Sequence, residues 1–263
     1  MAGRLKGKVA FVTAAGQGIG RAIALAYGAE GAKVAVASRT PSTVDAVVSE
    51  IKHAGGEAVG ITCDVADAGS VRKMVQKTVD AFGTVHILVN NAQGFGTAKN
   101  PKPAALPVPL EELEDEEWDY TIRAGASATL WAMKAAFPFM KTTGCGRIIN
   151  MGSSAGLIGV VGQGAYSAGK EAIRALTRTA AREWGQYGIT ANVICPMVVT
   201  DAMEKWKADE PQRFAAVADA VPVRRFGEPM RDIAPLAVFL AGEGAGYLTG
   251  MTYMAEGGFY LFA

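Results

Sequence analysis

The sequence has few residues of the kinds that build metal centres or disulfide frameworks. It contains only two histidines, His53 and His86, and three cysteines, Cys63, Cys145 and Cys195, which lie far apart in the chain. No spacing among them matches a metal-ligand set, so no metal site is expected. An odd number of widely separated cysteines is typical of buried thiols in a reducing compartment, which predicts a cytoplasmic protein without disulfides.

Long apolar segments and an excess of charge of one sign are also missing. Lysine and arginine total 26 against 25 aspartates and glutamates, which leaves a formal net charge of +1. This balance argues against nucleic acid or an anionic membrane surface as a partner. No apolar run approaches the ~20 residues that a membrane-spanning helix needs, so no membrane span is expected. Residues 1–8 lack the apolar core of a signal peptide.

What the chain does have is a regular alternation of apolar strands and amphipathic helices. This order predicts an α/β fold, a doubly wound parallel sheet with helices on both faces, in a single domain over residues 1–263. A stretch of mixed polarity at about 197–229 is expected to form a lid over a ligand. Expected strands cover residues 9–13, 33–38, 57–63, 86–90, 147–150, 190–195 and 251–255, and expected helices cover 21–27, 41–53, 71–82, 116–140, 165–187 and 232–240.

A glycine-rich turn follows the first expected strand directly. Gly16, Gly18 and Gly20 stand at alternate positions between this strand and the next helix. Such a turn lets the backbone approach a pyrophosphate, and the helix N-terminus then supplies unpaired N–H groups. An ordinary tight turn is the alternative, but three glycines in this context favour a dinucleotide. The candidate residues here are Thr13, Gln17, Gly18 and Ile19.

The end of the second expected strand bears on which dinucleotide is bound. An acidic residue at this place would hold the 2′-hydroxyl of NAD. The chain instead has Ser38, Arg39 and Thr40, whose hydroxyl and guanidinium groups suit a 2′-phosphate. A surface arginine at a strand end is the alternative. NADP(H) is therefore favoured, while NAD(H) stays possible.

Two further strand ends carry candidate cofactor residues. Asp64 and Val65 follow the third strand, where a carboxylate could accept a hydrogen bond from an adenine amino group. The alternative for Asp64 is a loop or helix-capping carboxylate. Asn91 and Ala92 follow the fourth strand. Since ligands of such folds bind outside the carboxyl ends of the strands, these residues are expected to share one site.

A tyrosine and a lysine four residues apart lie on the expected helix 165–187. Tyr166 and Lys170 share a helix face, so the two side chains should meet. A nearby ammonium stabilises a phenolate, whose ordinary pKa of about 10 is too high for acid-base work at neutral pH. Ser153, thirteen residues earlier, could polarise a substrate oxygen. A chance surface pair is the alternative when the pattern is taken alone.

Together these motifs resemble the short-chain dehydrogenase/reductase family over nearly the whole chain, in particular its single-domain carbonyl reductases of the 3-oxoacyl-ACP reductase type. The family's glycine turn, Thr-Gly-x-x-x-Gly-x-Gly, is matched by residues 13–20, and its Asn-Asn-Ala-Gly by residues 90–93. Its catalytic serine and Tyr-x-x-x-Lys are matched by Ser153, Tyr166 and Lys170 at the family spacing.

The resemblance implies a Rossmann-type fold and an NADP(H)-dependent oxidoreductase that interconverts a carbonyl and a secondary alcohol by hydride transfer. It implies that Tyr166 exchanges the proton, that Ser153 hydrogen-bonds the substrate oxygen, and that Lys170 lowers the tyrosine pKa and holds the nicotinamide ribose. The implied cofactor-binding residues are Thr13, Gln17, Gly18, Ile19, Ser38, Arg39, Thr40, Asp64, Val65, Asn91, Ala92, Tyr166, Lys170, Pro196 and Val199.

The chain departs from the family pattern at several positions. Ala14 stands where the family has its first glycine, Gln93 replaces the glycine after Asn-Asn-Ala, and Met197 replaces a glycine after the sixth strand. Gly125 stands where the family has a proton-relay asparagine, so Gly125→Asn should raise the rate if that relay limits turnover. The proline-rich stretch 95–109 is longer than in the family and forms either a wall of the substrate site or an inert insertion.

The sequence indicates the substrate and the oligomeric state less specifically than it indicates the fold and the cofactor. An apolar carbonyl or alcohol is suggested, and a homotetramer, or a homodimer, is implied by the resemblance. Two other functions stay open: a dinucleotide-binding sensor or scaffold without turnover, and a relative that uses the fold for elimination, dehalogenation or epimerisation. Candidate substrate contacts are Gln93, Phe95, Ser154, Met197 and Trp206.

Overall fold

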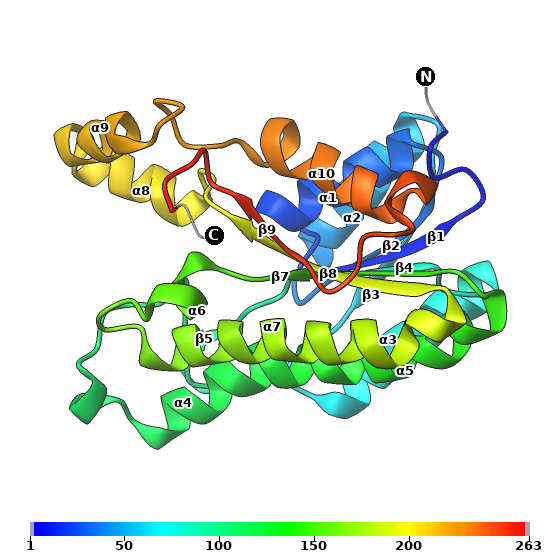
Figure 1. The fold of residues 1–263 in the computed structure, drawn as a ribbon, viewed down its shortest axis with the longest axis horizontal. Helices are drawn as coiled ribbons and strands as arrows, with labels where there is room; N and C mark the ends of the chain where they lie inside the picture. Colours follow the sequence, from blue (N-terminus) through cyan, green and yellow to red (C-terminus); the bar gives the residue numbers. More distant parts are fainter. Residues whose placement is uncertain (1–2, 261–263) are drawn as a thin grey trace.

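A seven-stranded parallel sheet forms the middle layer of the molecule (Figure 1). The computed structural model describes residues 3–260. The strand order is β3-β2-β1-β4-β7-β8-β9, and every neighbouring pair is parallel, so the predicted fold class is confirmed. The strands are β1 (Val9–Thr13), β2 (Lys33–Ser38), β3 (Glu57–Thr62), β4 (Ile87–Asn90), β7 (Gly146–Met151), β8 (Ile189–Pro196) and β9 (Thr252–Ala255).

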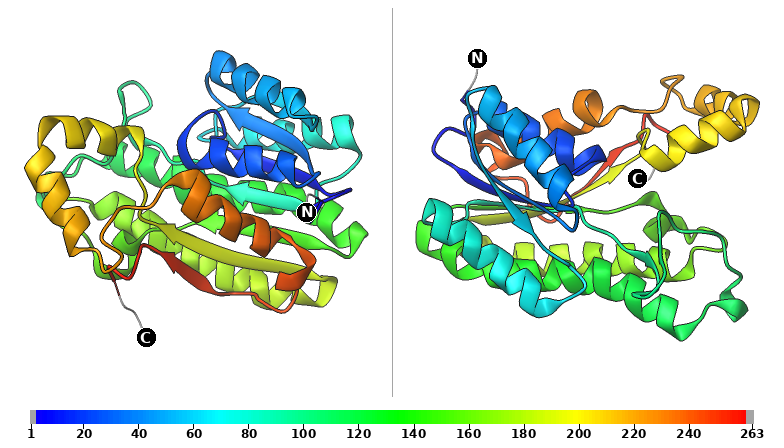
Figure 2. Two further views of the ribbon diagram at one scale, coloured as in Figure 1. Left: turned by 90° about the horizontal axis from the view of Figure 1, so that it is seen from above. Right: turned by 180° about the vertical axis from the view of Figure 1, so that it is seen from behind.

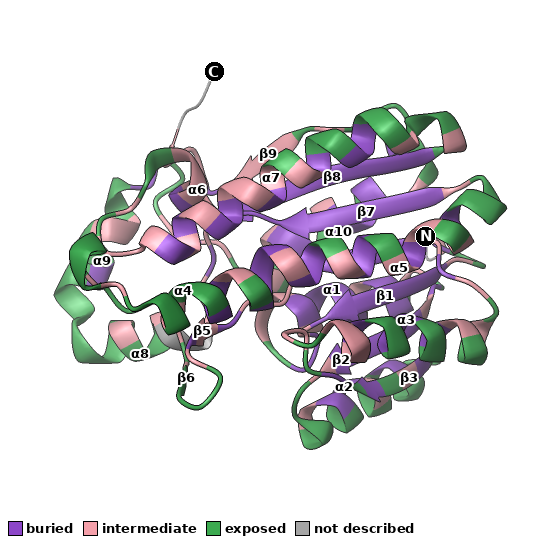
Figure 3. Ribbon diagram, turned by 90° about the horizontal axis from the view of Figure 1, so that it is seen from below, coloured by how far each residue is buried: buried purple, intermediate pink, exposed green. Residues whose placement is uncertain are grey.

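Helices cover both faces of this sheet (Figures 1 and 2). The helices α1, α2 and α10 lie on one face, and α3, α4, α5 and α7 lie on the other. Because both faces are covered, the central strands are mostly apolar. They are buried along their whole length, as Figure 3 shows for β1 and β7. The helices are α1 (Gly18–Ala29), α2 (Pro41–His53), α3 (Ala68–Phe82), α4 (Asp115–Ile122), α5 (Ala128–Thr143), α7 (Gly164–Trp184) and α10 (Ala234–Ala241).

The expected long helix 116–140 is interrupted by a wider turn. A π-helical segment, Arg123–Ser127, joins α4 to α5, and the Ala128 N–H reaches back to the Arg123 carbonyl. Single π turns of this kind occur often at functional sites. Several other predicted boundaries shift by one to three residues; α3, for example, begins earlier because the Asp67 side chain caps it by accepting from the Ser70 N–H.

Three segments that were expected to be irregular contain regular structure. The stretch 95–109 includes a small antiparallel pair, β5 (Phe95–Gly96) with β6 (Pro101–Lys102). The turn after β7 is a short helix, α6 (Ser154–Ile158). The expected lid 197–229 contains two helices, α8 (Asp201–Asp209) and α9 (Pro211–Ala220), which lie together at one end of the molecule (Figure 1).

The topology places the carboxyl ends of the strands where a ligand can bind. The chain order reverses between β1 and β4, the neighbouring pair at which the two halves of the sheet meet. A crevice forms at such a switch point, outside the strand ends. Within the described part of the chain, no helix is long and apolar enough to cross a membrane. All three cysteines are free; Cys63 and Cys195 are buried, whereas Cys145 is half-buried.

Candidate active site

The turn between β1 and α1 is shaped by close backbone packing. A Cβ atom at Gly16 would collide with the hydroxyl of Thr43. Gly18 has a φ of 54° and begins α1, and Ala14 has a φ of 49°, in the left-handed region that glycine prefers. The family-like turn is therefore present, but Ala14 adopts it with a strained backbone. The α1 N-terminus points its free N–H groups toward the crevice side of the turn.

Thr13 joins the ends of β1 and β4. Its hydroxyl donates to the Val89 carbonyl at 3.3 Å and accepts from the N–H groups of Asn91, at 2.9 Å, and Ala92, at 3.0 Å. The Asn91 side chain in turn donates to the carbonyls of Thr13 and Ala14. These side chains are therefore occupied in holding the glycine turn beside β4, and they would support a dinucleotide by shaping the backbone around it.

A cavity of about 800 Å³ lies outside the ends of β2, β3 and β4. Its size and its glycine-turn wall fit a dinucleotide. Predicted cofactor residues in its wall are Gln17, Ser38, Arg39, Thr40, Asp64, Val65 and Ala92, and predicted substrate residues there are Gln93, Phe95 and Trp206. Thr13, Gly18, Ile19, Asn91, Ser153, Ser154, Tyr166, Lys170, Pro196, Met197 and Val199 do not line it.

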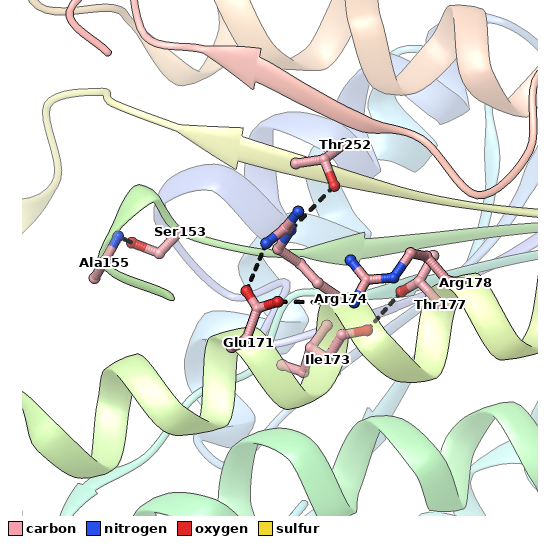
Figure 4. A network of polar contacts seen from close by, with 8 residues as sticks. All are labelled: Ser153, Ala155, Glu171, Ile173, Arg174, Thr177, Arg178 and Thr252. Carbon is pink, nitrogen blue, oxygen red and sulfur yellow. Dashed lines mark hydrogen bonds and ion pairs between the residues drawn. The ribbon is translucent and has the colours of Figure 1, made fainter. Parts of the chain in front are cut away.

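Ser153 lies at the carboxyl end of β7 and caps α6. Its hydroxyl oxygen accepts from the Ala155 N–H at 3.1 Å (Figure 4). Burial raises the pKa of Tyr166 above its usual value, and a hydrogen bond with Ser153 acts in the opposite direction. The structure therefore brings Ser153 and Tyr166 together, as their spacing predicts.

Lys170 is 3% exposed, and its ammonium lies 5.6 Å from the centre of the Tyr166 ring. The Lys170 Nζ donates to the Met151 carbonyl at 2.9 Å. Burial lowers the pKa of Lys170 to about 8. Burial is the largest influence on the pKa of Tyr166, and it acts against the ionisation of the phenol that a neighbouring ammonium favours.

The helix that carries these residues is fixed by a polar network one residue further along (Figure 4). Glu171 accepts from Arg174 at 2.6 Å, and the Arg174 Nε donates to the Thr252 hydroxyl on β9 at 3.2 Å. Arg178 adds a longer contact of 3.7 Å to Glu171. Since charge-assisted bonds of this kind are directional, they fix the position of α7 relative to the sheet edge.

Comparison with known proteins identifies the family. The family model for short chain dehydrogenases matches residues 8–211. The chain belongs to the short-chain dehydrogenase family. A 12alpha-hydroxysteroid dehydrogenase of a Clostridium species is 36% identical over 263 residues, covering 97% of this chain and 98% of the relative. A 3-oxoacyl-[acyl-carrier-protein] reductase of Synechocystis is 36% identical over 261 residues, covering 98% of this chain and 99% of the relative.

A solved structure agrees with this assignment. A Sinorhizobium meliloti protein described as a short-chain alcohol dehydrogenase superposes with a TM-score of 0.88, is 30% identical and covers 97% of both chains. Members of the short-chain dehydrogenase family are oxidoreductases that bind a nicotinamide dinucleotide. This chain therefore carries the framework of that chemistry.

Two of these departures pack against each other. A Cβ atom at Gly125 would lie 2.6 Å from Gln93 Oε1 and 2.9 Å from Gln93 Nε2. The Gln93 carboxamide therefore fills the space that a side chain at position 125 would occupy. Its nitrogen donates to the Gly94 and Thr121 carbonyls at 2.9 and 3.1 Å, while its buried oxygen has no hydrogen-bond partner among the described residues.

The ring of Phe95 lies between the cavity and the trio of Ser153, Tyr166 and Lys170. Phe95 lines the cavity and its ring centre lies 5.4 Å from that of Tyr166. The stretch 95–109 contributes Lys102, Pro103, Ala104 and Leu106 to the wall of the same cavity. The sequence contained no periodic signal for this placement, because the β5–β6 pair has only two residues per strand.

Two predicted substrate residues, Met197 and Trp206, belong to the expected lid 197–229, and only Trp206 lines the cavity. Trp206 lines the cavity and packs on Phe214 and Phe226, with ring centres 5.1 and 6.3 Å away. Met197 is held at the lid base, where its N–H donates to the Ala255 carbonyl at 3.0 Å. Tyr120, which lines the cavity and accepts a hydrogen bond from Arg39 at 3.1 Å, was not predicted. No sequence periodicity distinguished it from an ordinary core tyrosine.

Proposed function

We propose that this short-chain dehydrogenase is an NADP(H)-dependent oxidoreductase that interconverts a carbonyl and a secondary alcohol, with Tyr166 as the acid and base. The observation that supports this most directly is the buried Lys170 ammonium 5.6 Å from the centre of the Tyr166 ring, which in turn packs on Phe95 in the wall of a dinucleotide-sized cavity. A bound nicotinamide cofactor supplies or accepts the hydride. The protein supplies orientation and the proton.

Each residue of the trio has a distinct proposed task. Because burial raises the pKa of Tyr166, the phenol is protonated at neutral pH and can donate to a carbonyl oxygen as that oxygen gains charge. Ser153 hydrogen-bonds the same oxygen and orients it. Lys170 places a positive charge near the phenol, which favours the phenolate left after the proton has moved.

The proposed preference for NADP(H) depends on Arg39. Its guanidinium lines the cavity at the end of β2, next to the hydroxyls of Ser38 and Thr40. The carboxylate of Asp64, at the neighbouring strand end, accepts from the Ala66 N–H at 3.0 Å and is therefore already engaged in its own loop. A 2′-phosphate would meet cationic and neutral donors at the β2 end, whereas NADH would leave them unused.

A bulky, largely apolar ketone is the proposed substrate class. The wall beyond Phe95 is formed by Pro103, Leu106 and Trp206, which offer apolar surface to a ligand. The name of the Clostridium relative supports a steroid skeleton, whereas that of the Synechocystis relative supports a 3-oxoacyl chain. Rates with a ketosteroid and with a 3-oxoacyl thioester of similar size would distinguish the two.

We further propose that the enzyme is a cytoplasmic homotetramer. Three free cysteines suit a reducing compartment. The assembly is supported by exposed apolar side chains on two separate parts of the surface, Trp118 and Leu130 on α4 and α5, and Phe239 and Tyr247 at and after α10.

The decisive experiment follows NADPH absorbance with purified protein and a panel of ketones and aldehydes, from small to polycyclic. Wild type should oxidise NADPH with formation of an equal amount of alcohol, while Tyr166→Phe should lose at least ~100-fold in kcat and keep its affinity for NADPH. A fully active Tyr166→Phe enzyme would remove this residue from the acid-base role. Tight NADPH binding without turnover on any carbonyl would instead favour a binding protein.

A further inference from the structure

Tyr120 is a cavity residue to which neither the family pattern nor the predicted site assigned a task. It lies on α4, is 8% exposed and lines the cavity. Its ring packs against the chain just after β4, since a Cβ atom at Gly94 would lie 3.0 Å from the ring atom Cε1. The ring is therefore held between the helix and the backbone at Gly94, and only the hydroxyl remains to interact with the cavity.

The hydroxyl of Tyr120 is bonded to Arg39 in a way that leaves its own proton unused. The Arg39 Nη1 donates to the Tyr120 oxygen at 3.1 Å. A guanidinium has donors only, so the hydroxyl must be the acceptor in this bond. Within residues 3–260 the Tyr120 O–H has no second protein partner. Arg39 and Tyr120 thus form a connected set of donors on one cavity wall.

The charge and exposure of the two partners differ, which gives each a separate role. Arg39 is exposed, and an arginine of that kind moves among many rotamers unless something holds it. Tyr120 is buried and fixed by packing, so it can hold the guanidinium over the cavity. The donors that remain on Arg39, together with the Tyr120 proton and the Ser38 hydroxyl at the same strand end, match the acceptor oxygens of a phosphate monoester.

We propose that Tyr120 is a positioning residue for the 2′-phosphate of the cofactor. It holds the Arg39 guanidinium in place and donates its own proton to the same anionic group. This inference rests on the proposed NADP(H) preference and extends it from one residue on β2 to a pair that joins β2 to α4.

The test uses two small probes that contain only the adenosine end of the cofactor. Adenosine 2′,5′-bisphosphate carries the 2′-phosphate, and adenosine 5′-diphosphate does not, so the nicotinamide and the catalytic trio take no part. Binding of both probes is measured by calorimetry to wild type, Tyr120→Phe, Arg39→Ala and the double variant. Tyr187→Phe, at the far end of α7, is the matched control, and thermal unfolding checks that each variant is folded.

Tyr120→Phe keeps the ring and removes only the hydroxyl. It should weaken binding of the 2′,5′-bisphosphate about 3- to 10-fold, the range expected for the net loss of one hydrogen bond, and leave binding of the 5′-diphosphate unchanged. Arg39→Ala should have the larger effect on the same probe. The double variant should bind the same probe more weakly than Arg39→Ala, but by less than the two single losses combined, because Tyr120 acts partly through Arg39 and partly through its own proton.

Other results overturn the proposal in distinguishable ways. Equal weakening of both probes by Tyr120→Phe means that the hydroxyl contacts the shared adenosine. Unchanged binding of the 2′,5′-bisphosphate means that Tyr120 has no part in holding Arg39. Tighter binding means that Tyr120 blocks the guanidinium. If Arg39→Ala itself leaves the 2′,5′-bisphosphate unaffected, the NADP(H) preference fails as well, and the fault lies in the proposed function.

Discussion

Ala14 keeps a left-handed backbone without the glycine that usually occupies its position. Its φ of 49° strains a residue that has a Cβ atom by roughly 1–2 kcal/mol. Glycine would remove this strain but would also make the unfolded chain more flexible, by ~0.4–1 kcal/mol. The backbone angle is thus what distinguishes alanine from glycine at this position.

Replacing Ala14 with glycine should therefore stabilise the protein by up to about 1 kcal/mol, which raises Tm by roughly 2–4 °C for a chain of this size. Calorimetry of the two proteins without cofactor measures the difference. Ala15, which is buried on the same turn, serves as the control, since Ala15→Gly should lower Tm. A lower Tm for Ala14→Gly would show that the backbone angle of Ala14 does not destabilise the folded protein.

The packing of Gln93 on Gly125 changes what a substitution at position 125 should do. Asparagine at 125 overlaps the Gln93 carboxamide and forces it away from the Gly94 and Thr121 carbonyls. Gly125→Asn alone should thus lower kcat and Tm. The double variant Gln93→Gly/Gly125→Asn should recover both, with an interaction energy of ~1–3 kcal/mol in a double-mutant cycle. Additive effects on kcat and Tm would show that the two positions are independent.

The ionisation of the buried Lys170 ammonium should affect the pH dependence of kcat/KM. Because burial brings its pKa to about 8, Lys170 is a cation below that pH and neutral above it. If the positive charge supports proton transfer from Tyr166, kcat/KM for NADPH should be constant from pH 6 to 7 and fall as pH rises through about 8. A profile that stays flat to pH 9.5 would contradict a role for the charge.

At the scale of elements, the lid is attached at its base by a compact set of bonds. The N–H of Gly227 donates to the Met197 carbonyl at 3.1 Å, which joins the two ends of the segment 197–229. Asp232 then accepts two bonds of 2.7 Å from Arg225 and one from the Glu228 N–H. Hydrogen bonding to Arg225 lowers the pKa of Asp232 to about 2.

Asp232→Asn should loosen this base and speed cleavage of the lid by limited proteolysis, roughly 3- to 10-fold at neutral pH. In wild type the folded pKa lies below the ordinary value of about 4, so the carboxylate contribution is present above pH 4 and lost as pH falls toward 2. The difference between the two proteins should therefore shrink over that interval. Asp219→Asn, exposed on α9, should cleave like wild type.

The elements themselves differ in how well sequence patterns predict them. The central strands were predictable because burial on both faces leaves only apolar residues, as in 9–13. The π-helical turn at 123–127 was not, because small residues such as Ala124 and Ala126 fit an α-helix equally well. The contacts of Gln93 with Gly125 and of Arg39 with Tyr120 join residues 32 and 81 positions apart, and no local pattern records such a distance.

At the scale of the whole molecule, the exposed apolar side chains predict how copies associate. Trp118 on α4 and Leu130 on α5 lie on one side of the sheet, whereas Phe239 lies on α10, on the other side (Figure 1). Exposed apolar side chains on two separate faces suit a tetramer with two kinds of two-fold interface. Light scattering should give four times the chain mass of 27.4 kDa.

Breaking either patch should stop assembly at the dimer. Leu130→Lys and Phe239→Lys each place a charge in one expected interface, so each variant should yield dimers and the combination should yield monomers. Leu106→Lys is the control that should remain tetrameric, because Leu106 is more exposed than either residue but lies on the cavity wall. A monomeric wild type would contradict the prediction.

The exchange between positions 93 and 125 also restricts the route by which such a chain can have arisen. In a chain with glycine at 93 and asparagine at 125, gaining glutamine first is the costlier step, because the two side chains then compete for one volume. Losing the asparagine first leaves only a hole next to a cavity, which water can fill. Packing therefore favours the order that passes through glycine at both positions.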